Sequence, residues 1–92
     1  MFWATEHPQL AAIARIRLAR VLCALHAPQE ALLALNNNKN KAYQALVDET
    51  KGDVFTQLGK PEQARARYLS AQRQFMAQAI RSPTLIKMNA LN

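Results

Sequence analysis

The chain has 92 residues, enough for one small domain whose core contributes little net stability, so its packing has to be regular. Half of its residues are hydrophobic, with only 2 Gly and 4 Pro and few β-branched positions, a composition that favours helices and disfavours a sheet. The net charge is +6, and the Lys and Arg residues are spread over the whole sequence. This distribution favours a basic surface that keeps a small domain in solution. It argues against a clustered binding site for nucleic acid or anionic lipid.

The predicted elements of the first half are helical. After an N-terminal extension, residues 1–9, a helix is expected from Leu10 to His26 and a second from Pro28 to Leu35. The run 36–40 contains four asparagines and predicts a turn, because Asn tolerates left-handed backbone conformations and bonds to its own backbone.

The second half repeats this organisation. A third helix is expected over 41–58 with Gly59 as its terminator, followed by a fourth from Pro61 to Ile80. Residues 82–92 begin with Ser and Pro, which suit the N-cap and first turn of a short capping helix. The sequence therefore predicts five helices.

Helical spacing also predicts which faces are buried. In the first helix we expect a core-facing stripe, with Ile13 and Ile16 beside it and partly exposed: Ala14, Leu18, Val21, Leu22 and Leu25. The expected stripe of the fourth helix is Ala64, Tyr68, Ala71, Phe75 and Ala79.

An internal repeat links the two halves, since aligning Ala64 with Ala31 also brings the preceding positions into register. Each copy holds a small residue, an apolar pair, a leucine, a proline and an alanine: Ala19, Val21, Leu22, Leu25, Pro28 and Ala31, then Gly52, Val54, Phe55, Leu58, Pro61 and Ala64. The small residues let two helices approach closely, and the proline fits a first helical turn.

These positions resemble the tetratricopeptide family, whose repeat is about 34 residues of helix, turn and helix. Gly59 matches the turn glycine of that repeat, whereas the first copy has His26 there. The resemblance implies an all-α superhelix of two helical hairpins and a capping helix, with repeat one over about 10–40 and repeat two over about 41–80. It also implies a module that binds protein and is not an enzyme.

A narrower resemblance is to the C-terminal half of the ancillary SecYEG translocon subunit family (YfgM-like). It is carried by Arg17-Leu18-Ala19-Arg20-Val21, by Gly59-Lys60 with Ala64-Arg65, and by the ending Ile86-Lys87-Met88-Asn89-Ala90-Leu91. This resemblance implies a scaffold on the periplasmic side of the inner membrane that links translocation to periplasmic chaperones. The membrane anchor and first repeats would then lie upstream, and we expect this fragment itself to be soluble.

The tetratricopeptide resemblance also implies a partner-binding groove, lined by the first helix of each repeat. Its positions carry over to Arg20, Cys23, Ala24, Glu49, Asp53, Thr56 and Gln57. Two alternatives stay open: nucleic-acid binding by the basic surface, and self-association through the Ile13 and Ile16 face or the final helix with its Leu85, Met88 and Leu91.

The sequence predicts no catalytic residue, metal ligand, cofactor or small-molecule substrate. His7 and His26 have no Cys or carboxylate at zinc-ligand spacing, and the lone Cys23 suits a small buried position. Asp48 and Glu49 are interpreted, together with Asp53, as a solvated or groove-facing patch rather than an acid-base pair.

Overall fold

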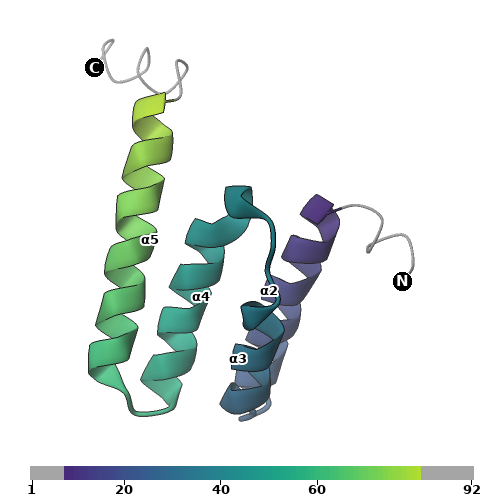
Figure 1. The fold of residues 1–92 in the computed structure, drawn as a ribbon. Coiled ribbons are helices and arrows are strands. Elements are labelled where there is room, and N and C mark those ends of the chain that lie inside the picture. Colours follow the sequence, from purple (N-terminus) through teal and green to yellow (C-terminus); the bar gives the residue numbers. More distant parts are fainter. Residues whose placement is uncertain (1–7, 82–92) are drawn as a thin grey trace.

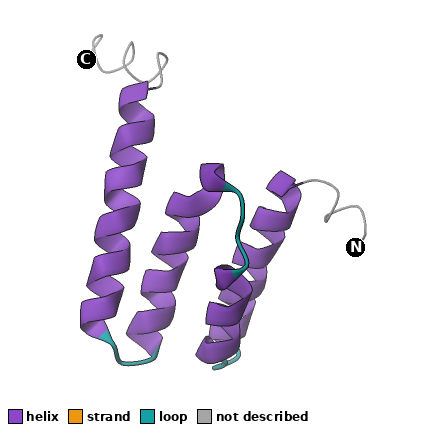
Figure 2. Cartoon of the chain, in the orientation of Figure 1, coloured by secondary structure: helices purple, strands orange, loops and turns teal. Residues whose placement is uncertain are grey.

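The computed structural model describes residues 8–81, and every regular element in that part of the chain is a helix (Figures 1 and 2). The elements are α2 (Pro8–Ala24), α3 (Pro28–Asn36), the 3-10 helix η1 (Lys41–Tyr43), α4 (Gln44–Gln57) and α5 (Pro61–Arg81). The all-α fold of helical hairpins is confirmed. The expected capping helix over 82–92 lies outside the described residues, as do residues 1–7 of the expected extension.

Two hairpins stand side by side. Helix α2 packs against α3, α4 packs against α5, and α4 also contacts both α2 and α3, so it lies between α5 and the first hairpin (Figure 1). Helix α5 has 21 residues and α4 has 14, and α5 extends beyond α4 (Figure 1). Among the described helices, none has the length and hydropathy of a membrane span.

One cluster of the core lies between the hairpins and draws residues from three helices: Ile16 and Ala19 of α2, Ala31 and Leu35 of α3, and Val47 and Val54 of α4. The expected orientation of α2 is therefore wrong for most of the stripe, although Leu22 packs against this cluster and Ile13 is partly exposed as expected. Ile16 is buried, while Leu18, Val21 and Leu25 are 50%, 54% and 69% exposed. Alanines on the same side of α2 as Ile16 let the neighbouring helices approach closely. Because α2 is apolar around most of its circumference, periodicity alone does not identify the buried face.

The expected stripe of α5 is only partly buried. Ala64 and Ala71 lie in the core, but Tyr68 and Phe75 are each 37% exposed. The alanines occupy the close contact with α4, so the aromatic rings stand at its edge and line a hollow between the two helices.

Both hairpin turns have the same geometry. Gly59 has φ +74°, and the Lys60 N–H donates to the Phe55 carbonyl at 2.9 Å. In the first hairpin His26 has φ +62°, and the Ala27 N–H donates to the Leu22 carbonyl at 2.8 Å. Gly59 is thus confirmed as a terminator, and His26 adopts the left-handed backbone that glycine adopts more readily.

We expect His26→Gly to stabilise the domain by about 1 kcal/mol, because it relieves a side chain held at positive φ. Gly59→Ala should destabilise it by about the same amount. Urea denaturation of both variants checks the pair. Equal destabilisation by the two substitutions would show that the His26 imidazole makes a stabilising contact that outweighs its backbone strain.

Candidate functional site

The seven expected groove residues lie on α2 and α4, and one contact joins the two helices there. The Gln57 side-chain amide donates to the backbone carbonyl of Cys23 at 2.9 Å. Cys23 is half-buried against the core, and burial, with a smaller contribution from the Asp53 carboxylate, raises the pKa of its thiol. Arg20 and Ala24 are exposed on the same helix as Cys23.

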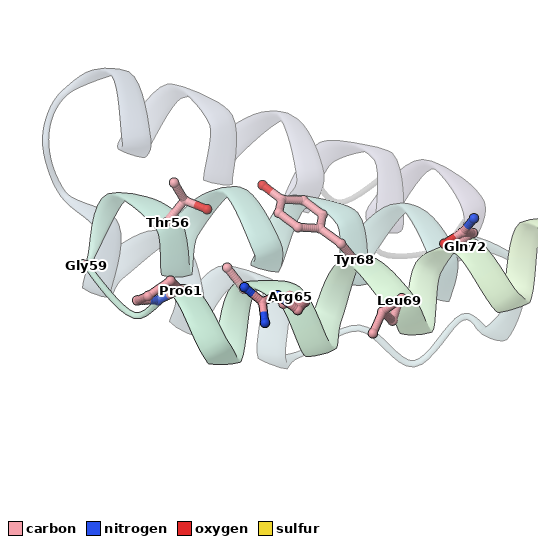
Figure 3. Close-up of a pocket in the computed structure, with 8 residues that line it drawn as sticks. Thr56, Gly59, Pro61, Arg65, Tyr68, Leu69 and Gln72 are labelled. Carbon is pink, nitrogen blue, oxygen red and sulfur yellow. The ribbon is translucent and has the colours of Figure 1, made fainter.

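The other expected residues, Glu49, Asp53 and Thr56, lie toward α5 and line two hollows on the α4/α5 face. The larger hollow has a volume of about 550 Å³ and is lined by Thr56, Gly59, Pro61, Ala64, Arg65, Tyr68, Leu69 and Gln72 (Figure 3). The other has about 380 Å³ and is lined by Glu49, Asp53, Tyr68, Ala71, Gln72, Phe75 and Met76. They share Tyr68 and Gln72, so we treat them as one surface, the α4/α5 groove.

The contribution of α5 to this groove was missed by sequence reasoning, which assigned Tyr68 and Phe75 to the core. A signal was present, because Leu69, Met76 and Ile80 are apolar residues outside the expected stripe. A helix with apolar residues on two sides has two faces to cover. In the described part of the chain, the side chains of Leu69, Met76 and Ile80 are all exposed.

Tyr68 is fixed from two directions. Its hydroxyl donates to the Asp53 carboxylate at 2.5 Å, and its ring lies over the backbone of buried Gly52. A Cβ added at Gly52 would lie 2.6 Å from the Tyr68 Cδ1 atom, which is closer than side chains pack. The small residue expected at position 52 therefore admits an aromatic ring from α5.

Burial is the main cause that raises the pKa of Tyr68 above its ordinary value of 10.0, and the hydrogen bond to Asp53 is the second. The pKa of Tyr68 is thus higher in the folded protein than in the unfolded chain. The stability that protonated Tyr68 contributes is therefore fully present below the unfolded pKa and is lost as the pH rises through the folded pKa.

We expect Asp53→Asn to lower the pKa of Tyr68, because the substitution removes the carboxylate that accepts the hydrogen bond of the hydroxyl. Titration of tyrosinate absorbance, with Tyr68→Phe isolating Tyr43, measures it. An unchanged titration would show that Asp53 has no effect on the hydroxyl.

A buried carboxylate holds α4 to α5 beside the groove. Asp48 is 3% exposed, so its interpretation as part of a solvated patch is wrong. Its two oxygens accept hydrogen bonds from Gln44 at 3.0 Å, Ser70 at 3.0 Å and Gln74 at 2.7 Å. Arg67 adds an ion pair at 3.6 Å.

This network continues into the turn before α4. The Gln44 side-chain oxygen accepts from the Asn38 amide at 3.0 Å, and the Asn38 amide also donates to the Asn40 carbonyl. The asparagine-rich turn is thus tied through Gln44 to Asp48. Since the Asp48 oxygens are engaged by neighbouring side chains, this carboxylate has a structural role that positions the groove helices.

The chain matches a family model described as "Tetratricopeptide repeat-like domain" over residues 2–92. No curated protein and no solved structure shows significant similarity to it. Domains of this kind are generally non-catalytic modules that interact with other proteins. Together, the two helical hairpins, their matching turns and the family match show that the chain belongs to the tetratricopeptide repeat-like domain family.

Proposed function

We propose that the chain binds protein through a surface formed by the first helices of its two hairpins. The surface residues are Arg20, Cys23, Ala24, Glu49, Asp53, Thr56 and Gln57. The observation that carries the proposal is the hydrogen bond from Gln57 to the Cys23 carbonyl, because it joins the ends of α2 and α4, while Glu49, Asp53 and Thr56 continue the surface toward α5. Arg20 on one helix and the two carboxylates on the other give this surface mixed charge.

The narrower proposal is that the chain is the periplasmic part of an ancillary SecYEG translocon subunit. It is supported by the strings Arg17-Leu18-Ala19-Arg20-Val21 and Ile86-Lys87-Met88-Asn89-Ala90-Leu91 and by membership of the repeat-like family. Its partners are the SecYEG channel and a periplasmic chaperone, and an upstream anchor holds it at the inner membrane. In this proposal repeat one spans about 10–40 and repeat two about 41–80.

Co-purification tests this proposal. The native gene product, tagged and extracted from membranes in mild detergent, should retain the channel subunits. Arg20→Glu reverses one charge on the proposed surface and should reduce their yield, whereas Arg73→Glu makes the same change on exposed α5 outside that surface and the groove. If the unaltered protein retains no channel subunit, the translocon assignment is wrong. If both variants lose the channel equally, the α2/α4 surface is not its binding site.

A further inference from the structure

Helix α2 carries an exposed apolar face that no described element covers. Ala14, Leu18, Val21 and Leu25 follow one another at spacings of three or four positions, which places them on one side of the helix. The last three are 50%, 54% and 69% exposed. We call these four residues the α2 stripe.

The internal repeat aligns the α2 stripe with a face of α4 whose packing is known from the structure. In the register that aligns Ala31 with Ala64, the α2 stripe corresponds to residues of the second copy: Val47, Lys51, Val54 and Leu58. Val47 and Val54 are buried in the core with residues of the first hairpin, and Leu58 packs against the same cluster. The α2 stripe therefore occupies the positions through which α4 packs onto the hairpin before it.

The same register identifies the complementary surface. Seven residues of the first hairpin belong to the core cluster or pack against it: Ile16, Ala19, Leu22, Cys23, Ala31, Leu32 and Leu35. Five of their seven counterparts in the second copy line the α4/α5 groove: Glu49, Thr56, Ala64, Arg65 and Tyr68. In the first hairpin this surface receives α4, and in the second it is open.

The chain thus carries both halves of one hairpin-to-hairpin contact, each without an occupant among the described residues. We propose that a second copy fills them, with the α2 stripe of one copy docked in the α4/α5 groove of the next. Hollows of about 550 and 380 Å³ can accept the Leu and Val side chains of the stripe. The inference goes beyond the proposed function, since it requires no other protein.

Charge complementarity favours this occupant. Arg17 and Arg20 are exposed on α2 next to the stripe, while two acidic residues, Glu49 and Asp53, line the groove with one basic residue, Arg65. A head-to-tail contact of this kind is heterologous, so it does not close after two copies unless the rotation between them forms a ring. Each added copy continues the series of first helices, and its docked stripe covers Glu49, Asp53 and Thr56 of the copy before it, so these three residues stay open to another protein only on the last copy.

The test is sedimentation of the full chain over a wide concentration range, with one variant for each half of the contact. Val21→Glu alters the stripe and Leu69→Glu alters the groove, and both side chains are exposed enough for the fold to tolerate them. Each variant alone should weaken self-association by about tenfold or more, because it buries a charged carboxylate among the apolar side chains of the contact. Leu33→Glu, at an exposed leucine of α3 outside both surfaces, should leave association unchanged.

Mixing distinguishes a head-to-tail contact from any symmetric one. The Val21→Glu copy retains an intact groove and the Leu69→Glu copy an intact stripe, so an equal mixture should form a one-to-one complex that does not grow further. Circular dichroism verifies that each variant is folded. A wild-type chain that stays monomeric at all concentrations, or a mixture that fails to associate, overturns the proposal. Association that begins only after residues 82–92 are removed also overturns it, and identifies that segment as the occupant of the groove.

Discussion

Asp48→Ala is expected to destabilise the domain by about 3 kcal/mol, the largest effect of any single substitution proposed for this chain. The substitution removes the carboxylate that accepts hydrogen bonds from Gln44, Ser70 and Gln74. These three partly buried side chains then lack their acceptor. The substitution also removes the ion pair of Arg67. Such a loss is a large fraction of the stability of a domain this small, so urea denaturation should show a much lower midpoint.

The neighbouring carboxylate is the matched control. Glu49 is only half-buried and lines the groove, so Glu49→Ala should change the free energy of unfolding by less than about 0.5 kcal/mol. Ser70→Ala removes one donor and should cost about 1 kcal/mol. Similar, small effects for Asp48→Ala and Glu49→Ala would contradict a clamping role for Asp48.

Gly52→Ala should destabilise the domain by about 2 kcal/mol, although alanine is the better helix former. On propensity alone the substitution would stabilise α4 by about 1 kcal/mol. The added methyl group collides with the Tyr68 ring, however, so the ring has to leave its place over Gly52 and lose its hydrogen bond to Asp53. Thermal or urea denaturation measures which of the two effects dominates.

A second background reverses the expected sign of this effect. In a Tyr68→Ala chain the collision is absent, and Gly52→Ala should then stabilise the domain by about 1 kcal/mol. The difference between the two backgrounds is the coupling between positions 52 and 68. If Gly52→Ala stabilises the wild-type chain as well, the ring does not rest on the helix backbone at Gly52.

The parts of the fold that could be predicted from sequence are those fixed by local chemistry. Gly59 ends α4 because only a residue tolerant of positive φ suits that turn, and Pro28 and Pro61 begin the helices that follow the two turns. Small residues at Ala19 and Gly52 indicate close helix contacts, and both are buried. Each of these features depends on residues within one or two turns of chain.

The role of Asp48 could not be predicted in this way. Ser70 and Gln74, two of its partners, lie 22 and 26 residues further along the chain, and they meet Asp48 only after α4 and α5 pack. Beside Glu49 in the sequence it resembles one more surface charge. Its burial is a property of the hairpin rather than of the local sequence.

The arrangement of the proposed surface residues could be predicted only in part, for a similar reason. The repeat positions placed the expected residues on α2 and α4, and the structure brings Cys23 and Gln57 together. It places Glu49, Asp53 and Thr56 along the α4/α5 groove, whose other wall includes Tyr68 and Phe75. Periodicity assigns an aromatic residue to a buried face but does not say whether a neighbouring helix covers the ring completely.

Site-specific photo-cross-linking in cells tests most directly whether the first helices of the hairpins form the protein-binding surface. A photoreactive residue replaces either Ala24 or Thr56 on that surface, or Leu33 or Gln63 on the second helices of the hairpins, and all four positions are exposed. We predict cross-links to other proteins from Ala24 and Thr56 and little or none from Leu33 and Gln63. Equal yields from the two pairs, or cross-links from Leu33 and Gln63 alone, would contradict the assignment of the binding surface to α2 and α4.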